Sequence, residues 1–407
     1  MTRASRKTKQ LVVGVVLSAV AWLLLHVFVL LRSHTAPRIY GAAMAMCVFQ
    51  SLFSPEPASL TLPFTLDITS SCDDREASPV VFIVDQKGFG DFRTVQDAID
   101  AVPDYNQVPV HIYINNGTFT EKVLIPHSKP YITLQGQGMD LTAIAWNDTA
   151  NSSGRTYKSA SVSVEATDFV AKNLSFLNTS PGPGVGVQGA QAVALRVSSD
   201  RAAFYGCGFY GFQDTLFDDQ GRHYFKECFI EGSIDFICGS GRSLYENCEL
   251  HSVANPSKKV SGSITAQRRL KWSEASAFSF VNCSITGTGN VLLGRAWGPF
   301  SRVIFAYTSM DSIVHPVGWD DWGDSGRTLT VVYGEYECSG LGSNRRKRAN
   351  WSHSLSDWQA YPYLSPLFID GDEWIPELMA SSEKKISAAT TQELGVLNYE
   401  HDDNDEL

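Results

Sequence analysis

The stretch from Gln191 to Asp235 reads QAVALRVSSDRAAFYGCGFYGFQDTLFDDQGRHYFKECFIEGSID and carries a regular spacing. Gln191, Gln213 and Asp235 recur at intervals of 22 residues. Nearly the same interval separates three cysteines: Cys207, Cys228 and Cys248. A period of this length is typical of structural repeats that stack into a solenoid. The spacing therefore predicts one long solenoid instead of several globular domains.

A short phrase that recurs along the chain indicates which solenoid this is. The phrase has an apolar lead, a small or polar turn position and then alternating apolar residues, and it occurs as KNLSF at 172–176, YGCGF at 205–209, KECFI at 226–230, ENCEL at 246–250 and FVNCSI at 280–285. Strands of period two at solenoid spacing favour an all-β fold, a single-stranded parallel β-helix. The segment TVQDAIDAVP, which begins with Thr94 as an N-cap, predicts a short helix that covers the N-terminal end of the solenoid.

The coils of such a solenoid would gather the polar residues of the opening stretch. Residues one period apart would lie on strands about 4.8 Å apart. Gln191, Gln213 and Asp235 would then stack, with Asp214 beside Gln213. Two close carboxyl groups do not both ionise easily, so one can serve as a general acid and the other as a nucleophile, while amides can donate to an oxyanion. Ladders of Gln and Asp also cap turns in solenoids, so spacing alone leaves a structural role open.

Composition and motifs exclude several classes of function. The formal net charge of −10 makes nucleic acid an unexpected partner. An acidic polysaccharide would also be repelled at long range, so binding to one would depend on local groups. The chain has no G-x-S-x-G elbow, no H-E-x-x-H motif, no phosphate loop and no His/Cys grouping with zinc spacing. The motifs therefore give no support to a serine hydrolase or a metalloprotease.

The N-terminal residues 1–32 have the pattern of a targeting segment. Basic residues precede an uncharged run of 21 residues at 11–31. The run suits either a cleaved signal peptide or a retained membrane anchor, and both place the rest of the chain in the secretory pathway. Glycosylation sequons agree with this route and lie at Asn116, Asn147, Asn151, Asn173, Asn178, Asn282 and Asn350.

The remaining chain divides into three parts. Residues 33–78 lack a periodic pattern and are expected to form a linker, 79–378 hold the β-helix, and 379–407 form an acidic tail that we expect to be disordered.

In an oxidising compartment Cys228 and Cys248, one coil apart, are the favoured disulfide, with a pair of buried free thiols as the alternative.

Aromatic and basic residues mark the C-terminal third. Trp297, close to Arg295, is predicted to stack on a sugar ring, whereas packing is expected for the other tryptophans, at 319, 322, 351, 358 and 374. The basic run at 344–348 is expected to be a solvated loop.

Five ordered segments together resemble the signature segments of plant pectin methylesterases. They are GTFTEKV at 117–123, QAVAL at 191–195, GFQDTL at 211–216, GSIDFICG at 232–239 and LGRAWG at 293–298. The resemblance covers about Val80 to Pro376. It implies a pectin-lyase-like, right-handed parallel β-helix and a form of the enzyme without the inhibitor-like pro-region.

The resemblance also implies roles for residues at matching positions. Asp214 would be the general acid and then the base, and Asp235 would be the nucleophile. Gln191 and Gln213 would stabilise the anionic intermediate, and Arg295 would hold Asp235 through a bidentate pair.

Two further residues would bind substrate, and two positions depart from the family pattern. Trp297 would line the sugar subsite, and Thr156 would contact substrate, although its segment RTYKSA matches loosely. Cys238 stands where the family usually has Phe, and Ala296 where it often has Pro. Neither departure removes a reacting group.

The implied function is hydrolysis of the methyl esters of homogalacturonan to pectate and methanol by a secreted, monomeric cell-wall enzyme. The resemblance implies no metal and no organic cofactor. A proteinaceous pectinesterase inhibitor is a candidate partner. The same fold also hosts pectate lyases and polygalacturonases, and a catalytically dead wall-binding solenoid is the alternative outside enzymes. A lyase would want acidic calcium ligands, and a glycosidase two or three carboxylates without an amide pair.

Overall fold

The computed structural model describes residues 79–183, 187–257, 259–375 and 378. All described residues belong to the unit Arg75–Leu407, and the other unit, Met1–Asp74, lies outside the described residues. The predicted targeting segment at 1–32, with its alternative as an anchor at 11–31, the linker at 33–78 and the tail at 379–407 also lie outside them. Within the described part of the chain, no helix is long and apolar enough to cross a membrane.

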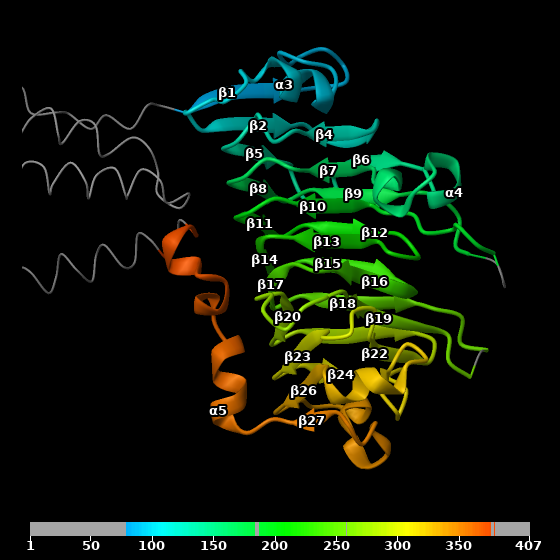
Figure 1. The fold of residues 1–407 in the computed structure, drawn as a ribbon. Coiled ribbons are helices and arrows are strands. Elements are labelled where there is room, and N and C mark those ends of the chain that lie inside the picture. The colour runs from blue at the N-terminus through cyan, green and yellow to red at the C-terminus, as the bar shows by residue number, and fades with distance from the viewer. Residues whose placement is uncertain (1–78, 184–186, 258, 376–377, 379–407) are drawn as a thin grey trace, which may run out of the picture. The chain divides into compact units, whose positions relative to one another are not determined.

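The body is a stack of coils, and a complete coil contributes one strand to each of three parallel sheets (Figure 1). Sheet A runs through β1 (Val80–Val84), β2 (Val110–Ile114), β5 (Ile132–Gln135), β8 (Phe169–Lys172), β11 (Ala202–Tyr205), β14 (Arg222–Lys226), β17 (Arg242–Glu246), β20 (Ala277–Val281), β23 (Arg302–Ala306), β26 (Val332–Tyr336) and β27 (His353–Ser354). Sheet B runs through β3 (Gly117–Thr120), β6 (Thr142–Trp146), β9 (Ser175–Asn178), β12 (Gly208–Tyr210), β15 (Phe229–Gly232), β18 (Glu249–Val253), β21 (Ser284–Thr288) and β24 (Ser309–Met310). Sheet C runs through β4 (Val123–Ile125), β7 (Val162–Val164), β10 (Leu195–Ser198), β13 (Leu216–Gln220), β16 (Ile234–Gly239), β19 (Gly262–Gln267), β22 (Val291–Arg295) and β25 (Trp319–Asp320).

Helices are short and lie outside the coils. They are α3 (Val95–Ala101), α4 (Ala150–Ser153) and α5 (Asp357–Ala360), with 3-10 turns η1 (Thr156–Ser159), η2 (Ser325–Leu329), η3 (Leu341–Ser343), η4 (Arg345–Lys347), η5 (Tyr361–Tyr363), η6 (Pro366–Ile369) and η7 (Gly371–Glu373). The architecture confirms the predicted all-β solenoid, a right-handed parallel β-helix.

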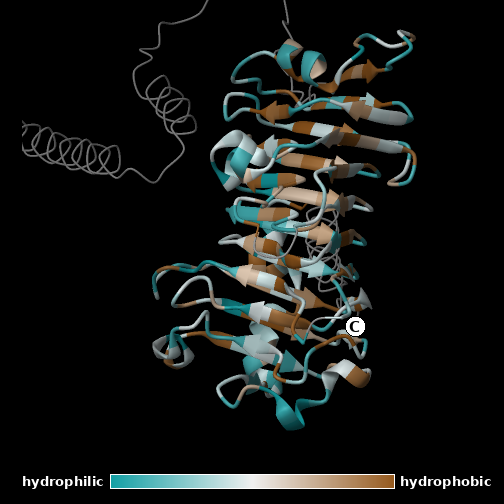
Figure 2. Cartoon of the chain, turned by 90° about the vertical axis from the view of Figure 1, so that its right-hand side faces the viewer, coloured by the Kyte–Doolittle hydropathy of each residue, from teal (hydrophilic) through white to brown (hydrophobic). Residues whose placement is uncertain are grey.

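Aromatic rings stacked along the interior of sheet A form the spine of the core. The centroids of neighbouring rings are 4.8 Å apart for Phe204 and Phe225, 4.5 Å for Phe225 and Tyr245, 4.5 Å for Tyr245 and Phe280, and 4.6 Å for Phe280 and Phe305. These separations follow the spacing of neighbouring strands, so each coil repeats the same inward position. Hydrophobic residues follow the strands and hydrophilic residues the connecting loops (Figure 2).

The recurring phrase of the sequence is the corner between sheets A and B. Its turn residue has a positive φ in each coil, at Asn173, Gly206, Glu227, Asn247 and Asn282. This left-handed conformation suits Gly and Asn, which explains the small or polar residue at that position. The residue after the turn points into the core and is a cysteine in four of these coils: Cys207, Cys228, Cys248 and Cys283.

The predicted disulfide between Cys228 and Cys248 is wrong, because both are buried free thiols. Each sulfur instead lies within hydrogen-bonding distance of backbone carbonyls. The Cys228 thiol donates to the carbonyl of Phe204 at 3.5 Å, and the Cys248 thiol donates to the carbonyl of Phe225 at 3.5 Å. The cysteines are therefore core ladder residues, the alternative that the spacing left open.

Helix α3 covers the first coil, as the sequence predicts, and buries Val95, Ala98 and Ile99. The Thr94 hydroxyl accepts from the backbone N–H of Asp97 at 3.1 Å. The carboxylate of Glu121 accepts from the N–H groups of Val95 and Gln96. Glu121 belongs to the GTFTEKV segment, so that segment serves the N-terminal cap of the solenoid.

The prediction of a solvated loop for the basic run at 344–348 holds for Asn344, Arg346 and Lys347, which are exposed, but is wrong for Arg345 and Arg348. Arg348 is only 8% exposed and donates to Glu335 at 2.9 Å, and Arg345 pairs with the same carboxylate. Glu335 is itself buried, and two arginines supply the charge that its burial requires.

Candidate active site

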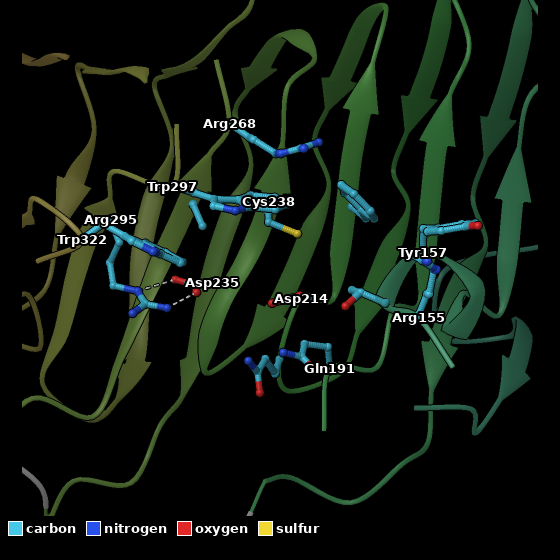
Figure 3. Close-up of a pocket in the computed structure, with 14 residues that line it drawn as sticks. Arg155, Tyr157, Gln191, Asp214, Asp235, Cys238, Arg268, Arg295, Trp297 and Trp322 are labelled. Atoms are coloured by element: carbon cyan, nitrogen blue, oxygen red, sulfur yellow. Dashed lines mark hydrogen bonds and ion pairs between the residues drawn. The ribbon is translucent and has the colours of Figure 1, made fainter. Parts of the chain in front are cut away.

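An open cavity of about 610 Å³ lies on the outer face of sheet C. Its floor is a ladder of register partners, in which Phe217 pairs with Cys238, Cys238 with Ala266, and Ala266 with Arg295. The lining also contains Arg155, Thr156, Tyr157, Gln191, Gln213, Asp214, Asp235, Arg268, Trp297 and Trp322. Every substrate- and reaction-related residue predicted from the sequence therefore reaches this one cavity (Figure 3).

The step between coils at the site is 21 residues, not the predicted 22. Gln213 pairs with Ile234, and farther along the same strands Leu216 pairs with Ile237. Asp214 and Asp235 are therefore the equivalent pair, and the prediction that Gln213 and Asp235 occupy equivalent positions is wrong by one residue. Both aspartates have a positive φ, 59° and 49°, which interrupts the alternation of a regular strand just where the carboxyl groups meet the cavity.

Asp235 is a buried carboxylate that a guanidinium holds by two bonds. Only 4% of the residue is exposed. Arg295 Nε donates to Oδ1 at 2.9 Å, and Arg295 Nη2 donates to Oδ2 (Figure 3). This fork-to-carboxylate geometry fixes both the charge and the orientation of Asp235.

Ser263 completes the setting of Asp235 and was missed in the sequence. Its hydroxyl donates to Asp235 Oδ1 and accepts from the Asp235 backbone N–H at 3.1 Å. Ser263 is 28 residues from Asp235 and is 1% exposed. Ser263 directly precedes ITAQRR at 264–269, a further segment that resembles the pectin methylesterases, and this was the available signal. The loop between β18 and β19 obscures the spacing.

Asp214 and the two glutamines present unused polar groups to the cavity. No side-chain hydrogen bond is formed by Gln191, Gln213 or Asp214 within the described ranges. If these residues capped turns, their amides and carboxylates would form hydrogen bonds with neighbouring backbone groups. The arrangement therefore favours the reactive interpretation of these residues over the ladder interpretation.

The two carboxyl groups sit in opposite electrostatic environments. Burial and then the charge of Asp235 hold the pKa of Asp214 well above its ordinary value. Burial lowers the pKa of Arg295, but the hydrogen bonds and charge of Asp235 outweigh it, and the net shift is upward. Asp214 therefore holds its proton to a higher pH than an ordinary aspartate, beside a carboxylate that Arg295 binds, and such a difference suits an acid and a nucleophile.

Aromatic side chains form the sides of the cavity. Trp297 packs near Phe217, with ring centroids 6.3 Å apart, and the guanidinium of Arg268 lies 5.0 Å from the Trp297 ring. The guanidinium of Arg295 lies 4.3 Å from the ring of Trp322. Thr156 is the first residue of η1, the turn that precedes β7, and it also lines the cavity.

The tryptophans predicted to be packing residues differ from one another. Trp319 is buried and stacks on Tyr333 at 4.4 Å, while Trp351 and Trp374 are partly buried against the core clusters. Trp322 lines the cavity and Trp358 is 76% exposed, so the packing prediction is wrong for these two.

The geometry permits nucleophilic attack on a carbonyl with acid–base assistance. It offers an oriented carboxylate, a carboxyl whose pKa is raised and two amide donors in one open groove. Among the residues that the structure describes, no group of three or more His, Cys, Asp or Glu side chains could hold a metal ion.

Comparison with known proteins gives the family. The pectinesterase family profile matches residues 81–372 of this chain. The chain belongs to the pectinesterase family. As a member it is a carboxylic ester hydrolase.

Relatives and solved structures agree with this family. Probable pectinesterase 8 of Arabidopsis thaliana is 53% identical over 296 residues, which cover 72% of this chain and 75% of the relative. Pectinesterase QRT1 of the same plant is 45% identical over 303 residues, covering 72% and 78%. The structure of pectin methylesterase from carrot is 30% identical, has a TM-score of 0.68, and is matched over 74% of this chain and 95% of its own.

Proposed function

We propose that this pectinesterase-family chain hydrolyses the methyl esters of homogalacturonan to carboxylates and methanol, and so modifies pectin in the plant cell wall. The observation that carries the proposal is the carboxyl pair: Arg295 binds Asp235 by two bonds, and the pKa of the neighbouring Asp214 is raised. A pectin methylesterase has been solved in complex with a hexasaccharide, and its structure resembles this chain with a TM-score of 0.61 at 26% identity. That likeness supports a polymeric sugar substrate here.

In the first step Asp235 attacks the ester carbonyl carbon at C6 of a galacturonosyl unit. The electron pair of the C=O bond moves to the oxygen, and the amides of Gln191 and Gln213 donate to that oxyanion. When the intermediate collapses, the bond from carbon to the methoxy oxygen breaks. Asp214 gives its proton to the departing oxygen, methanol leaves, and an acyl-enzyme anhydride on Asp235 remains.

In the second step Asp214, now ionised, takes a proton from water. The water oxygen attacks the same carbonyl carbon, and collapse of the second intermediate releases Asp235 as a carboxylate and the uronic acid as product. Arg295 keeps Asp235 oriented throughout, while Trp297 and Thr156 hold the sugar in the groove. The cycle balances without a metal or an organic cofactor.

The test is to incubate the enzyme with highly methyl-esterified pectin and measure methanol, new reducing ends and unsaturated uronosyl ends. We expect methanol without chain cleavage, and no methanol from Asp235→Asn. Reducing ends would point to a glycosidase, unsaturated ends would point to a lyase, and a folded enzyme that releases nothing would point to a binding solenoid.

We also infer that the body enters the secretory pathway, either after removal of 1–32 or attached through 11–31, and that it acts as a monomer that a pectinesterase inhibitor could bind. The exposed sequon asparagines, which are available to a glycosyltransferase, are Asn116, Asn147, Asn151, Asn173, Asn282 and Asn350. The Asn178 amide is buried and donates to three backbone carbonyls. This asparagine is therefore inaccessible to a glycosyltransferase in the folded protein. N-terminal sequencing of the mature protein separates the cleaved form from the anchored one.

A further inference from the structure

A second open cavity, of about 500 Å³, lies where the turns η5 and η6 meet sheet A. Arg242 and Arg302, the first residues of β17 and β23, line it together with residues of the two turns. It shares no lining residue with the active-site cavity. The loop between β19 and β20 separates the two, since Arg268 lines the active-site cavity and Ala275 lines the second cavity. The second cavity is therefore a distinct feature of the molecule.

The walls of the second cavity are fixed to sheet A, beside which the C-terminal segment lies (Figure 1). The hydroxyl of Ser279 donates to the carbonyl of Tyr363 at 2.7 Å, and the ring of Tyr363 packs 5.3 Å from that of Phe368. Arg242 donates to both carboxylate oxygens of Asp370, at 2.7 and 3.0 Å. The cavity is thus held in shape before any ligand binds, which reduces the cost of ordering on binding.

Arg302 brings a guanidinium to this cavity that finds no acceptor among the described residues. Its Nε is buried without a hydrogen-bond partner, and no acidic residue belongs to the described lining. Arg242, in contrast, is satisfied by Asp370. Because an unsatisfied buried donor costs free energy, most such groups in folded proteins have a partner. An anionic ligand would supply the acceptors that the described chain lacks.

A second arginine beside Arg302 adds to the positive charge. Arg269 is buried, and its guanidinium donates to backbone carbonyls, including those of Glu274 at 2.8 Å and Phe300 at 3.3 Å. The carboxylate of Glu274 accepts from the backbone N–H of Leu270. Burial and then the charge of Arg302 lower the pKa of Arg269, so the two guanidinium groups repel each other. This region would attract an anion on a protein whose formal net charge is −10.

The rest of the lining suits a sugar ring. Tyr361 is 74% exposed and Leu367 is 62% exposed, and Pro362 is exposed between the two tyrosines of η5. The hydroxyl of Ser365 forms no capping hydrogen bond with η6. Aromatic and aliphatic surfaces pack against the C–H face of a sugar, while hydroxyl groups bind its O–H groups. A uronosyl unit combines such a ring with the carboxylate that Arg302 could accept.

We propose that the second cavity is a non-catalytic binding site for a de-esterified uronosyl unit of pectin, with Arg302 as the residue that binds its carboxylate. The inference rests on the proposed function for the identity of the polymer. A carboxylate accepts charge-assisted, bidentate hydrogen bonds from a guanidinium, whereas a methyl ester is neutral and a weaker acceptor. The site would hold the enzyme on the polymer without taking part in hydrolysis. Two contacts on one polymer raise the effective concentration of ester at the active site.

The first test titrates trigalacturonate into the enzyme by isothermal titration calorimetry. We expect two sites in the wild-type enzyme, and at least about a 10-fold weaker second site in Arg302→Gln and in Tyr361→Ala, because each removes part of the ligand's contacts. Arg93→Gln is the matched control, since Arg93 is exposed and lines neither cavity. Arg302→Lys, which keeps the charge but loses the fork, should retain part of the affinity.

A single site in the wild-type enzyme, or two sites of unchanged affinity in both variants, overturns the inference. So does a loss in Arg302→Gln that comes with a lower melting temperature while Tyr361→Ala keeps both sites, because Arg302 would then be structural. Inorganic phosphate that binds the second site as tightly as trigalacturonate would mean an anion site without sugar recognition, which also contradicts the proposal.

The second test compares methanol release from methyl-esterified trigalacturonate and from long, partly de-esterified pectin. Arg302→Gln should raise KM on the long polymer by about 10-fold, since the second contact is lost, and should leave kcat and KM on the short ester unchanged. An equal loss on both substrates would contradict a separate site. If the wild-type enzyme releases no methanol from either substrate, the proposed function fails, while the trigalacturonate titration still decides whether the second site exists.

Discussion

Asp218 and Asp235 are both buried on neighbouring strands of sheet C, but only Asp235 lines the open cavity. Asp218 of β13 is fully buried, its Oδ1 lies 2.5 Å from Nδ1 of His223, and its Oδ2 accepts from Tyr245 at 2.6 Å. Nε2 of His223 lies 2.7 Å from the carbonyl of Ser199. Because both ring nitrogens of His223 face acceptors, the ring is a buried imidazolium paired with Asp218.

Burial and charge alone therefore do not make a carboxylate reactive. Burial opposes a charged His223, but the charge and hydrogen bonding of Asp218 raise its pKa above the ordinary value. Both carboxylate oxygens of Asp218 and both ring nitrogens of His223 have hydrogen-bond partners inside the protein. A side chain at Gly241 would place its Cβ 2.0 Å from Asp218 Oδ1, which shows how completely the space is filled. Asp235 also has a cation, but it has in addition an open cavity and a second carboxyl, Asp214, that holds a proton.

The largest expected effect comes from removing the reactive carboxylate. Asp235→Asn should lower the rate of methanol release by at least about 1,000-fold, because an amide cannot form the acyl-enzyme. Circular dichroism and the melting temperature should show a folded protein. Asp324→Asn, at a carboxylate whose side chain is 58% exposed, serves as the control. Substantial turnover by folded Asp235→Asn would remove Asp235 from the role of nucleophile.

The same substitution at the sealed pair should affect stability instead of chemistry. Asp218→Asn leaves the imidazolium of His223 without its counter-charge, and we expect a loss of about 3–5 kcal/mol in the free energy of unfolding. Urea denaturation measures this loss. At low temperature the folded variant should keep most of its methanol release. If activity were lost while stability stayed unchanged, the contrast between the two aspartates would be wrong.

The hydrogen bonds by which Arg295 orients Asp235 can be weakened without removal of the positive charge beside this carboxylate. Arg295→Lys keeps a cation but loses the planar fork that donates to both carboxylate oxygens, so we expect about a 100-fold lower kcat. Methanol release under saturating substrate gives this number. Wild-type kcat in Arg295→Lys would mean that a simple positive charge is sufficient at this position.

Ser263 should have a smaller effect of the same kind. Ser263→Ala removes one hydrogen bond to the Asp235 carboxylate and one acceptor of its backbone N–H, and we expect about a 10-fold loss of kcat with little change in KM. Ser263→Thr keeps the hydroxyl and should recover most of the activity. A loss that Thr does not rescue, or one confined to KM, would show that Ser263 does not position the nucleophile.

The sequence was sufficient for the architecture and for the predicted residues that share the cavity, but not for Ser263, for Trp322 as a lining residue or for the register between coils. The spacing of Gln191, Gln213 and Asp235 indicated neighbouring coils, while the pairing of Gln213 with Ile234 depends on how each turn is built and shifted the alignment by one residue. The role of Ser263 was hidden by a loop of variable length. The cysteine spacing fitted a disulfide and a thiol ladder equally well, since both require neighbouring strands. Long-range partners such as Glu335 for Arg348 leave no local signal at all.

The central claim is that Asp214 and Asp235 are coupled neighbours with separate roles, and carboxyl titration by ¹³C NMR tests it most directly. In the wild-type enzyme the pKa of Asp214 should lie well above the ordinary value of about 3.9, because of burial and the charge of Asp235. In Asp235→Asn that charge is gone and Arg295 is left unpaired, and both changes favour the ionised form of Asp214. Its pKa should therefore fall, yet remain above the ordinary value because burial persists, and in the wild-type enzyme kcat/KM should decline as the pH rises through the higher pKa. An Asp214 pKa that does not move when Asp235 is neutralised would contradict the account.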